Sequence, residues 1–269
     1  MNEEKDILTL IESSIKKGNS NIKLFTSNLL SNIKNITSTD NLKKIIEKRL
    51  FEKNLYFIRH AEAKHNVLEK KYKGDFDKCN IYDPELTRNG INQTKTTAEK
   101  IKNEKIICDS VFVSPLSRTI QTYYLVKEHF NKDTQVIITD FVREVLSSYD
   151  KNKGVKLSTL KDELKKENFN FEFITKEYWW FDFGEFKANE SEGQLRFHLR
   201  LRLFILWLIF RPEKNMIIIS HSHVFSALQN KGIRNADFVK MNNKVLLEKI
   251  YELLLANLSK LFEKKTKTK

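Results

Sequence analysis

The sequence contains little cysteine, proline or glycine: two, three and seven residues in a chain of 269. Cys79 and Cys108 form no CxxC or metal-binding pattern, so we expect two free thiols in a reducing compartment. No apolar stretch is long enough for a bilayer, because the longest, Leu203 to Phe210, falls far short of the roughly 20 residues required. The first residues lack the basic flank and apolar core of a secretory signal. These absences predict a soluble, cytoplasmic protein.

Acidic residues are scarce relative to basic ones, with 35 Asp and Glu against 48 Lys and Arg and a net charge of +13. The lysines are spread along the chain, usually alternate with acids, and are not interleaved with aromatic residues on one segment. This pattern argues against a nucleic-acid partner or a membrane surface, while a positive field would steer phosphorylated substrates inward. We therefore expect a small phosphorylated substrate.

The chain divides into three parts. Residues 1–50 carry helical periodicity and predict a helical N-terminal extension, with partial disorder as the alternative. Residues 51–243 predict the main domain. Residues 244–269 predict an amphipathic helix with a basic tail, which we expect to dock on its own domain; a homo-oligomer contact is the second interpretation.

Strand and helix patterns alternate within residues 51–243, which predicts a mostly parallel sheet with helices on both faces, an α/β fold. The predicted strands cover residues 54–58, 110–113, 135–141 and 216–220, and the predicted helices cover residues 86–105, 116–130 and 192–210. An insertion at about 145–190 interrupts this pattern. It contains a candidate helix at 155–168 and an aromatic cluster from Tyr178 to Phe183, interpreted equally as a lid over a site or as a packing plug.

Two of the predicted strands end in histidine. Arg59 and His60 follow one apolar run, and His221 follows another, more than half the chain later. Because ligands of open α/β sheets bind at the carboxyl ends of the strands, these residues predict a composite site. Arg118 follows a third apolar run and Glu144 a fourth.

This set of residue types fits phosphoryl transfer. A neutral imidazole, for which we choose His60, can attack phosphorus and hold the phosphoryl group covalently. Negative charge develops on the phosphoryl oxygens, and Arg59 and Arg118 are suited to bind it because a guanidinium stays charged and presents a fork of donors.

Three further residues complete the hypothesis. His221 would supply a second imidazole, Asn66 could donate from its amide, and Glu144 could protonate the leaving alkoxide if a nearby phosphate raised its pKa. A metal site at His221 and His223, with His60 or His65 nearby, is the alternative. No matching carboxylate cluster accompanies these histidines, so we expect no metal and no cofactor.

The residues resemble the histidine phosphatase superfamily, also called phosphoglycerate mutase-like, and within it a eukaryotic branch. Five motifs of that family are matched in order over roughly residues 54–240: Arg59-His60-Ala61-Glu62 with Asn66, Leu86-Thr87-Arg88-Asn89-Gly90-Ile91-Asn92-Gln93, Ser114-Pro115-Leu116-Ser117-Arg118-Thr119-Ile120-Gln121-Thr122, Val142-Arg143-Glu144, and Ile219-Ser220-His221-Ser222-His223. The resemblance implies a phosphohistidine at His60, phosphate contacts from Arg59, Arg118, Asn66 and His221, a proton donor at Glu144, and no metal.

The sequence also departs from the family pattern. Ala61 replaces the glycine of the first motif, and Ser222 and His223 replace the two glycines that follow the second histidine. We expect His223 to face outward, with an extra phosphate contact as the alternative. The Asn-x-Phe-x-Gly-Trp signature of glycolytic mutases is absent, which favours hydrolysis. The sequence thus predicts a metal-independent phosphatase; a phosphoglycerate mutase and a catalytically weak phospho-ligand-binding regulatory protein are the alternatives.

Overall fold

The computed structural model describes residues 39–147, 149–171, 174, 176–181 and 193–252. Most of the N-terminal segment at 1–50 and of the C-terminal segment at 244–269 therefore lies outside the described residues. The predicted division into an extension, a domain and a terminal helix stays a prediction.

The core is one six-stranded sheet with the order β4-β3-β2-β5-β1-β6. Neighbouring strands from β4 to β1 run parallel, and only β6, at the edge, is antiparallel to its neighbour β1. The predicted mostly parallel sheet is confirmed. The strands are β1 (Asn54–Arg59), β2 (Ser110–Val113), β3 (Gln135–Ile138), β4 (Phe169–Asn170), β5 (Asn215–Ser220) and β6 (Phe238–Lys240).

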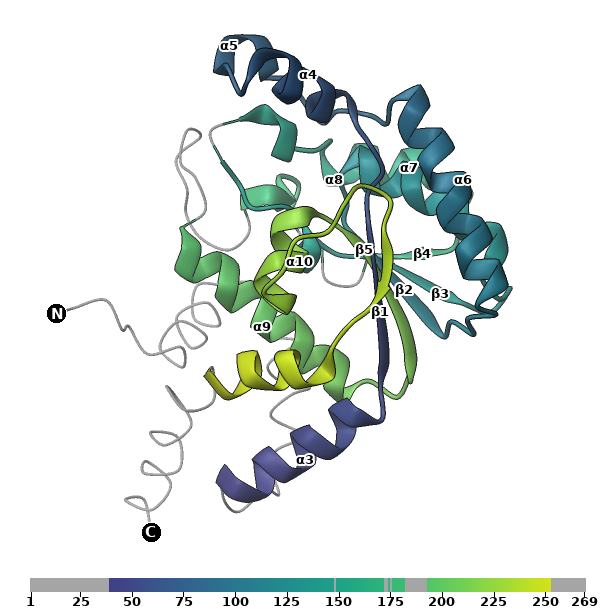
Figure 1. The fold of residues 1–269 in the computed structure, drawn as a ribbon, viewed down its shortest axis with the longest axis vertical. Coiled ribbons are helices and arrows are strands. Elements are labelled where there is room, and N and C mark those ends of the chain that lie inside the picture. Colours follow the sequence, from purple (N-terminus) through teal and green to yellow (C-terminus); the bar gives the residue numbers. More distant parts are fainter. Residues whose placement is uncertain (1–38, 148, 172–173, 175, 182–192, 253–269) are drawn as a thin grey trace, which may run out of the picture.

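The central strands are apolar on both faces because each face is covered by helices. Side chains of a strand alternate between faces, so Phe57 and Ile218 join one core cluster while Ile58 and Ile219 join the other. Figure 1 shows the two helical layers on opposite sides of the sheet. The first cluster includes side chains of α3 (Thr39–Phe51), α9 (Gln194–Phe210) and α10 (Ser222–Gln229), and the second includes those of α6 (Arg88–Asn103), α7 (Ser117–Val126) and α8 (Leu157–Glu163).

Two short helices, α4 (Lys64–Tyr72) and α5 (Phe76–Cys79), follow the carboxyl end of β1 at the top of Figure 1. Four 3₁₀ helices lie in the connections: η1 (Lys127–His129), η2 (Asp140–Val142), η3 (Asp150–Asn152) and η4 (Trp179–Phe181). A further helical segment at 243–252 runs up to the end of the described chain.

Several predicted element ends were wrong for local reasons. The strand predicted at 135–141 stops at Ile138, because the hydroxyl of Thr139 accepts a hydrogen bond from the Phe141 amide and starts a 3₁₀ turn. The helix predicted at 86–105, with its opening near Thr87, does begin there: Thr87 caps α6 by accepting from the Gly90 amide, and the helix ends two residues early, at Asn103. The helix predicted at 116–130 changes to 3₁₀ after residue 126, and the one at 155–168 shortens to 157–163.

The described part of the insertion packs into the core beside α7 and α8. Trp179 is fully buried and donates its indole N–H to the Val155 carbonyl over 2.8 Å. A Cβ atom added at Gly154 would lie 2.3 Å from the Trp179 ring, so only glycine fits beneath it. Trp180 is buried in the same cluster. These tryptophans match the packing-plug interpretation, while the rest of the aromatic cluster, residues 182 and 183, lies outside the described residues.

In the described part of the chain, no helix is both long enough and apolar enough to span a membrane. The longest described helix, α9, carries Arg196, Arg200 and Arg202 within its length.

Helix α3 is joined to the core through its apolar side, where Leu42, Ile46 and Leu50 are buried in the same cluster as α9. We predict that Ile46→Ala lowers the free energy of unfolding by about 2–5 kcal/mol, because it leaves a cavity in this cluster. The same change at Ile107, which is 64% exposed, is the matched control and should cost under about 1 kcal/mol. Urea unfolding of both variants tests this; equal stability would show that α3 contributes nothing to the core.

Candidate active site at the carboxyl ends of β1, β2 and β5

The parallel register of β1 and β5 sets two histidines side by side. Arg59 pairs with Ser220, so the next residues, His60 and His221, both lie just beyond the strand ends. The His60 amide donates to the Ser220 carbonyl over 2.9 Å, and the two imidazole centroids are 5.2 Å apart. Both side chains are buried. The two histidines predicted from distant parts of the sequence therefore share one site.

The hydrogen bonds of His60 determine which of its nitrogens can react. Its Nδ1 lies 2.8 Å from the Ala61 carbonyl, and a carbonyl can only accept, so Nδ1 carries the proton. In the neutral ring this leaves the lone pair on Nε2. Burial, followed by the charge of Arg118, lowers the pKa of His60 well below its usual value. His60 is thus a neutral imidazole whose free lone pair lies on Nε2.

His221 is held from the neighbouring strand. Its Nε2 is 2.8 Å from the hydroxyl of Ser114, which follows β2, and its buried Nδ1 has no partner. Burial and the charge of Arg118 also lower the pKa of His221 well below its usual value. If Ser114 donates its hydroxyl proton to Nε2, then Nδ1 bears the ring proton and can donate it to a ligand.

Two arginines, buried Arg118 and half-buried Arg59, supply positive charge beside these histidines. Arg59 donates to the Ile233 carbonyl, and Arg118 donates to the Lys151 carbonyl and to Asn152 Oδ1. Within the described residues neither forms an ion pair, and the Nε–H of each is buried without a hydrogen-bond partner. Burial lowers the pKa of Arg118 to about 10, which still leaves it charged near neutral pH. Buried charges are ordinarily paired, so these two guanidinium groups are candidates for holding an anion.

A third histidine, which the sequence analysis considered only for the alternative metal site, lies beside His60. His65 is buried, and its ring centroid is 5.7 Å from that of His60. Its Nε2 accepts from the Asn66 amide, and its Nδ1 is buried without a partner. Burial, with the charge of Arg118, lowers the pKa of His65 to about 2. His65 is therefore neutral and adds a second unsatisfied Nδ1 to the site.

Asn66 is largely occupied by the protein itself. Its Oδ1 accepts from the Ala63 amide and from Asn235 Nδ2, while its own amide group donates to His65. Asn235 also donates to the His60 carbonyl. The sequence analysis gave Asn235 no role, because it lies in a loop before β6, a strand of three residues that the sequence did not reveal. The predicted phosphate contact of Asn66 stays a prediction.

Glu144 follows η2 and is held close to the arginines. Its side chain is 9% exposed; Oε1 accepts from the Val145 amide at 2.9 Å, and Oε2 lies 3.1 Å from His223 Nδ1. Burial raises its pKa, but hydrogen bonding to His223, the charge of His223 and the Val145 amide outweigh it, so the net pKa of Glu144 is lowered. His223 itself is 70% exposed, so it faces outward and still touches Glu144.

Most other polar motif residues support the loop between β1 and α4. Gln93 Oε1 accepts from the Glu62 amide, Thr122 Oγ1 accepts from the Ala61 amide, and Thr87 Oγ1 donates to Glu62 Oε1. Gln121 Oε1 accepts from Leu86, whose bridge to Ala63 closes the loop. These residues position the backbone that follows His60.

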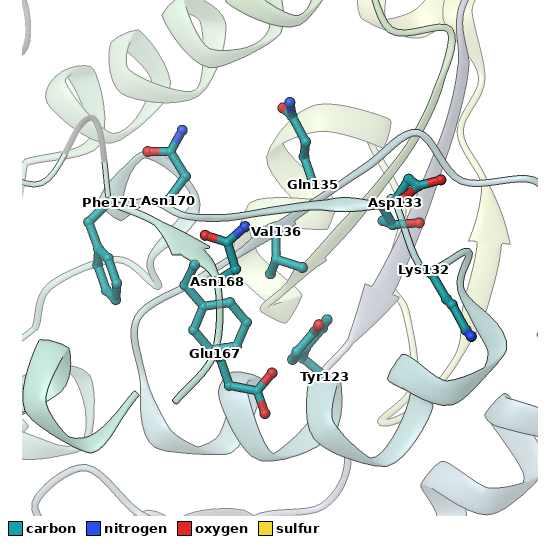
Figure 2. Close-up of a pocket in the computed structure, with 11 residues that line it drawn as sticks. Tyr123, Lys132, Asp133, Gln135, Val136, Glu167, Asn168, Asn170 and Phe171 are labelled. Atoms are coloured by element: carbon teal, nitrogen blue, oxygen red, sulfur yellow. The ribbon is translucent and has the colours of Figure 1, made fainter. Parts of the chain in front are cut away.

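A separate cavity of about 770 Å³ opens at the amino end of β3 and along β4, as Figure 2 shows. Parallel strands place amino and carboxyl ends at opposite edges of the sheet, so this cavity is remote from His60. Its lining comprises Tyr123, Lys132, Asp133, Thr134, Gln135, Val136, Glu167, Asn168, Phe169, Asn170 and Phe171. Among the described residues, no group of three or more His, Cys, Asp or Glu side chains is arranged to hold a metal ion.

One known protein family matches most of this chain. The model of the histidine phosphatase superfamily (branch 1) matches residues 55–243, a span that contains every strand of the sheet except β1's first residue. The chain belongs to the histidine phosphatase superfamily. The resemblance inferred from five motifs is confirmed at this level.

Members of the superfamily are found among similar proteins and structures. Phosphoglycerate mutase-like protein 1 of Arabidopsis thaliana is 26% identical over 209 residues, which are 66% of this chain and 73% of that protein. A Schizosaccharomyces pombe protein described as a probable phosphatase is 26% identical over 85 residues, 32% of this chain and 37% of its own length. The mycobacterial glucosyl-3-phosphoglycerate phosphatase structure has a TM-score of 0.44 and 16% identity over 70% of this chain and 92% of that chain.

Gly90, a glycine of the superfamily motif, permits α6 to approach the loop after His60. A Cβ atom at this position would lie 2.1 Å from the Glu62 carbonyl oxygen. We predict that Gly90→Ala lowers the free energy of unfolding by about 1–3 kcal/mol, because backbone must move to admit the methyl group. Gly232→Ala, where nothing lies within 4 Å, is the control and should change stability far less. Equal urea midpoints for the two variants would contradict the close approach.

Proposed function

We propose that this member of the superfamily is a metal-independent phosphatase that hydrolyses a phosphomonoester through a phosphohistidine at His60. The observation that carries the proposal is a neutral imidazole beside two guanidinium groups, each with a buried Nε–H that has no hydrogen-bond partner and no ion pair within the described residues. A nucleophile and a preformed site for the phosphoryl oxygens are the two requirements of a covalent phosphoryl transfer. Membership of the superfamily supports the same reaction class.

The proposed reaction has two steps. In the first, His60 Nε2 bonds to phosphorus as the bond to the alkoxide breaks, and Glu144 protonates the leaving oxygen. In the second, water attacks phosphorus, the bond to Nε2 breaks, and the water proton returns to Glu144. Arg59, Arg118 and the Nδ1 protons of His221 and His65 would stabilise the negative charge that develops on the phosphoryl oxygens.

The substrate is proposed to be a small phosphorylated metabolite, handled in the cytoplasm without nucleic acid or membrane as a partner. A homo-oligomer remains compatible with the proposal. Hydrolysis is preferred to a mutase reaction because the mutase signature is absent; the region after the first motif reads Tyr72-Lys73-Gly74-Asp75-Phe76. A panel of phosphorylated metabolites, with 3-phosphoglycerate mutase activity measured in parallel, separates the two activities. A regulatory binding protein would bind members of the panel without turnover.

His60→Ala is predicted to abolish hydrolysis, because the covalent step has no other nucleophile at this position. Labelling with a phosphorylated substrate, carried out in chelator and quenched with base, should give an adduct that is stable to base and lost in acid, in the wild type only. His129→Ala is the control: this histidine lies in η1, beyond the end of α7 opposite Arg118, and its loss should leave turnover unchanged. Wild-type turnover by His60→Ala would refute the mechanism, and a requirement for added divalent metal would refute metal independence.

Glu144→Gln is predicted to slow hydrolysis of an alkyl phosphate by about 10²–10⁴-fold, since an alkoxide leaves poorly without a proton. Hydrolysis of a nitrophenyl phosphate should fall much less, because a nitrophenolate leaves without protonation. Comparing the losses on the two substrates distinguishes a loss of proton donation from general damage to the pocket. Equal losses on both substrates would assign Glu144 a structural role, with Glu62 or Asp150 as the next candidate acids.

A further inference from the structure

His223 connects the buried carboxyl of Glu144 to solvent. It lies in the first turn of α10, where the superfamily motif carries a glycine. Its Nδ1 is 3.1 Å from Glu144 Oε2, and the exposed fractions of the two side chains are 70% and 9%. The residue that differs from the motif glycine is therefore the one that contacts the proposed acid, Glu144.

Both carboxyl oxygens of Glu144 accept hydrogen bonds. The Val145 amide donates to Oε1, and Oε2 faces the ring nitrogen of His223. When Nδ1 of His223 carries the proton and donates to Oε2, Glu144 is in its ionised form, in keeping with the net lowering of its pKa by the hydrogen bond and charge of His223 and by the Val145 amide. In the substrate-free protein Glu144 therefore holds no proton for a leaving alkoxide, and the nearest group that can hold one is the imidazole of His223.

We propose, on the basis of the proposed function, that His223 holds the leaving-group proton in the free enzyme and passes it to Glu144 when a phosphorylated substrate binds. His223 thereby acts through Glu144 and does not contact the reacting atoms. The pair, rather than the carboxyl alone, is the acid of the reaction.

The surrounding charges explain the direction of transfer. Arg59 on β1, Lys151 on η3 and Arg118 on α7 are the cations whose charges act on the pair, and all favour an ionised Glu144. Hydrogen bonding to Glu144 and its charge raise the pKa of His223, against burial and the two nearby cations. A bound phosphate neutralises these cations and adds negative charge. Because Glu144 is the more deeply buried partner, its proton affinity rises more than that of exposed His223.

Over one turnover the pair of Glu144 and His223 neither gains nor loses a proton. On binding, the Nδ1 proton of imidazolium His223 moves to Glu144 Oε2 and leaves a neutral ring. During transfer to His60 Nε2 the phosphorus–oxygen bond breaks, and Glu144 gives the proton to the leaving oxygen. In hydrolysis the hydroxyl oxygen of water bonds to phosphorus, the phosphorus–Nε2 bond breaks, and the water proton returns through Glu144 to His223.

His223→Gln tests the proposal because glutamine can still donate to Glu144 but cannot release a proton near neutral pH. The turnover of an alkyl phosphate and of a nitrophenyl phosphate is measured against pH for wild type, His223→Gln and Glu144→Gln. We expect the alkaline fall of the alkyl reaction to move at least about one pH unit lower in His223→Gln, with about tenfold or greater loss near pH 8. Activity should recover toward acid pH, where Glu144 holds its own proton, and the loss on the aryl substrate should be much smaller.

His129→Gln is the matched control, since His129 also lies near a carboxylate, 3.5 Å from Glu128, but outside the site. Its pH profile should equal that of the wild type. An unmoved alkaline fall in His223→Gln overturns this proposal while leaving the proposed function intact. Absence of wild-type turnover on every phosphate overturns both.

A second measurement does not depend on turnover. NMR titration of the His223 ring in the full-length protein should give a pKa above the usual value, and Glu144→Gln should lower it. Equal titration of His223 in the two proteins would overturn the proposal even if His223→Gln failed to fold.

Discussion

The parallel pairing of β1 with β5 is the constraint on which the site depends. The register places Arg59 opposite Ser220, and the sheet hydrogen bond from His60 to Ser220 carries this alignment one residue past the strands. Slipping the register by one residue would turn apolar side chains from one core cluster toward the other, so both helical layers oppose it. The packed core therefore fixes the distance between the imidazoles of His60 and His221.

Burial gives these imidazoles their chemical character. Two guanidinium groups that stay charged, without a carboxylate partner within 4.0 Å in the described chain, keep the neighbouring histidines neutral. The same charges attract a phosphate, whose binding would satisfy the unpartnered Nε–H groups of Arg59 and Arg118 and the unpartnered Nδ1 atoms of His65 and His221. In the proposed reaction, burial of the imidazoles and the positive charge beside them would keep the nucleophile neutral, and the same charge would bind the phosphate.

Sequence reasoning predicted the parts of this arrangement that depend on periodicity and order. The strands, their parallel pairing and the convergence of His60, His221, Arg118 and Glu144 follow from apolar runs that end in polar residues, and the family motifs fixed their order. Contacts made by loops could not be derived in this way. The support of Arg118 by the Lys151 carbonyl and Asn152, and of His60 by Asn235, comes from segments whose sequences have no period. The short strands β4 and β6 were missed because two or three residues carry no detectable alternation.

The motif glycines show how a substitution can alter chemistry without altering the fold. Ala61 adds one methyl group where the superfamily has glycine, and the residue is buried with its amide bonded to Thr122. A glycine at residue 223 would leave Glu144 Oε2 without the imidazole that now lies 3.1 Å from it. Histidine instead gives that oxygen a partner that titrates near neutral pH, since the unperturbed imidazole pKa is about 6.5. Under the proposal, a carboxylate held ionised by its neighbours would still take part in acid catalysis, because the proton it lacks would be held on the imidazole 3.1 Å away.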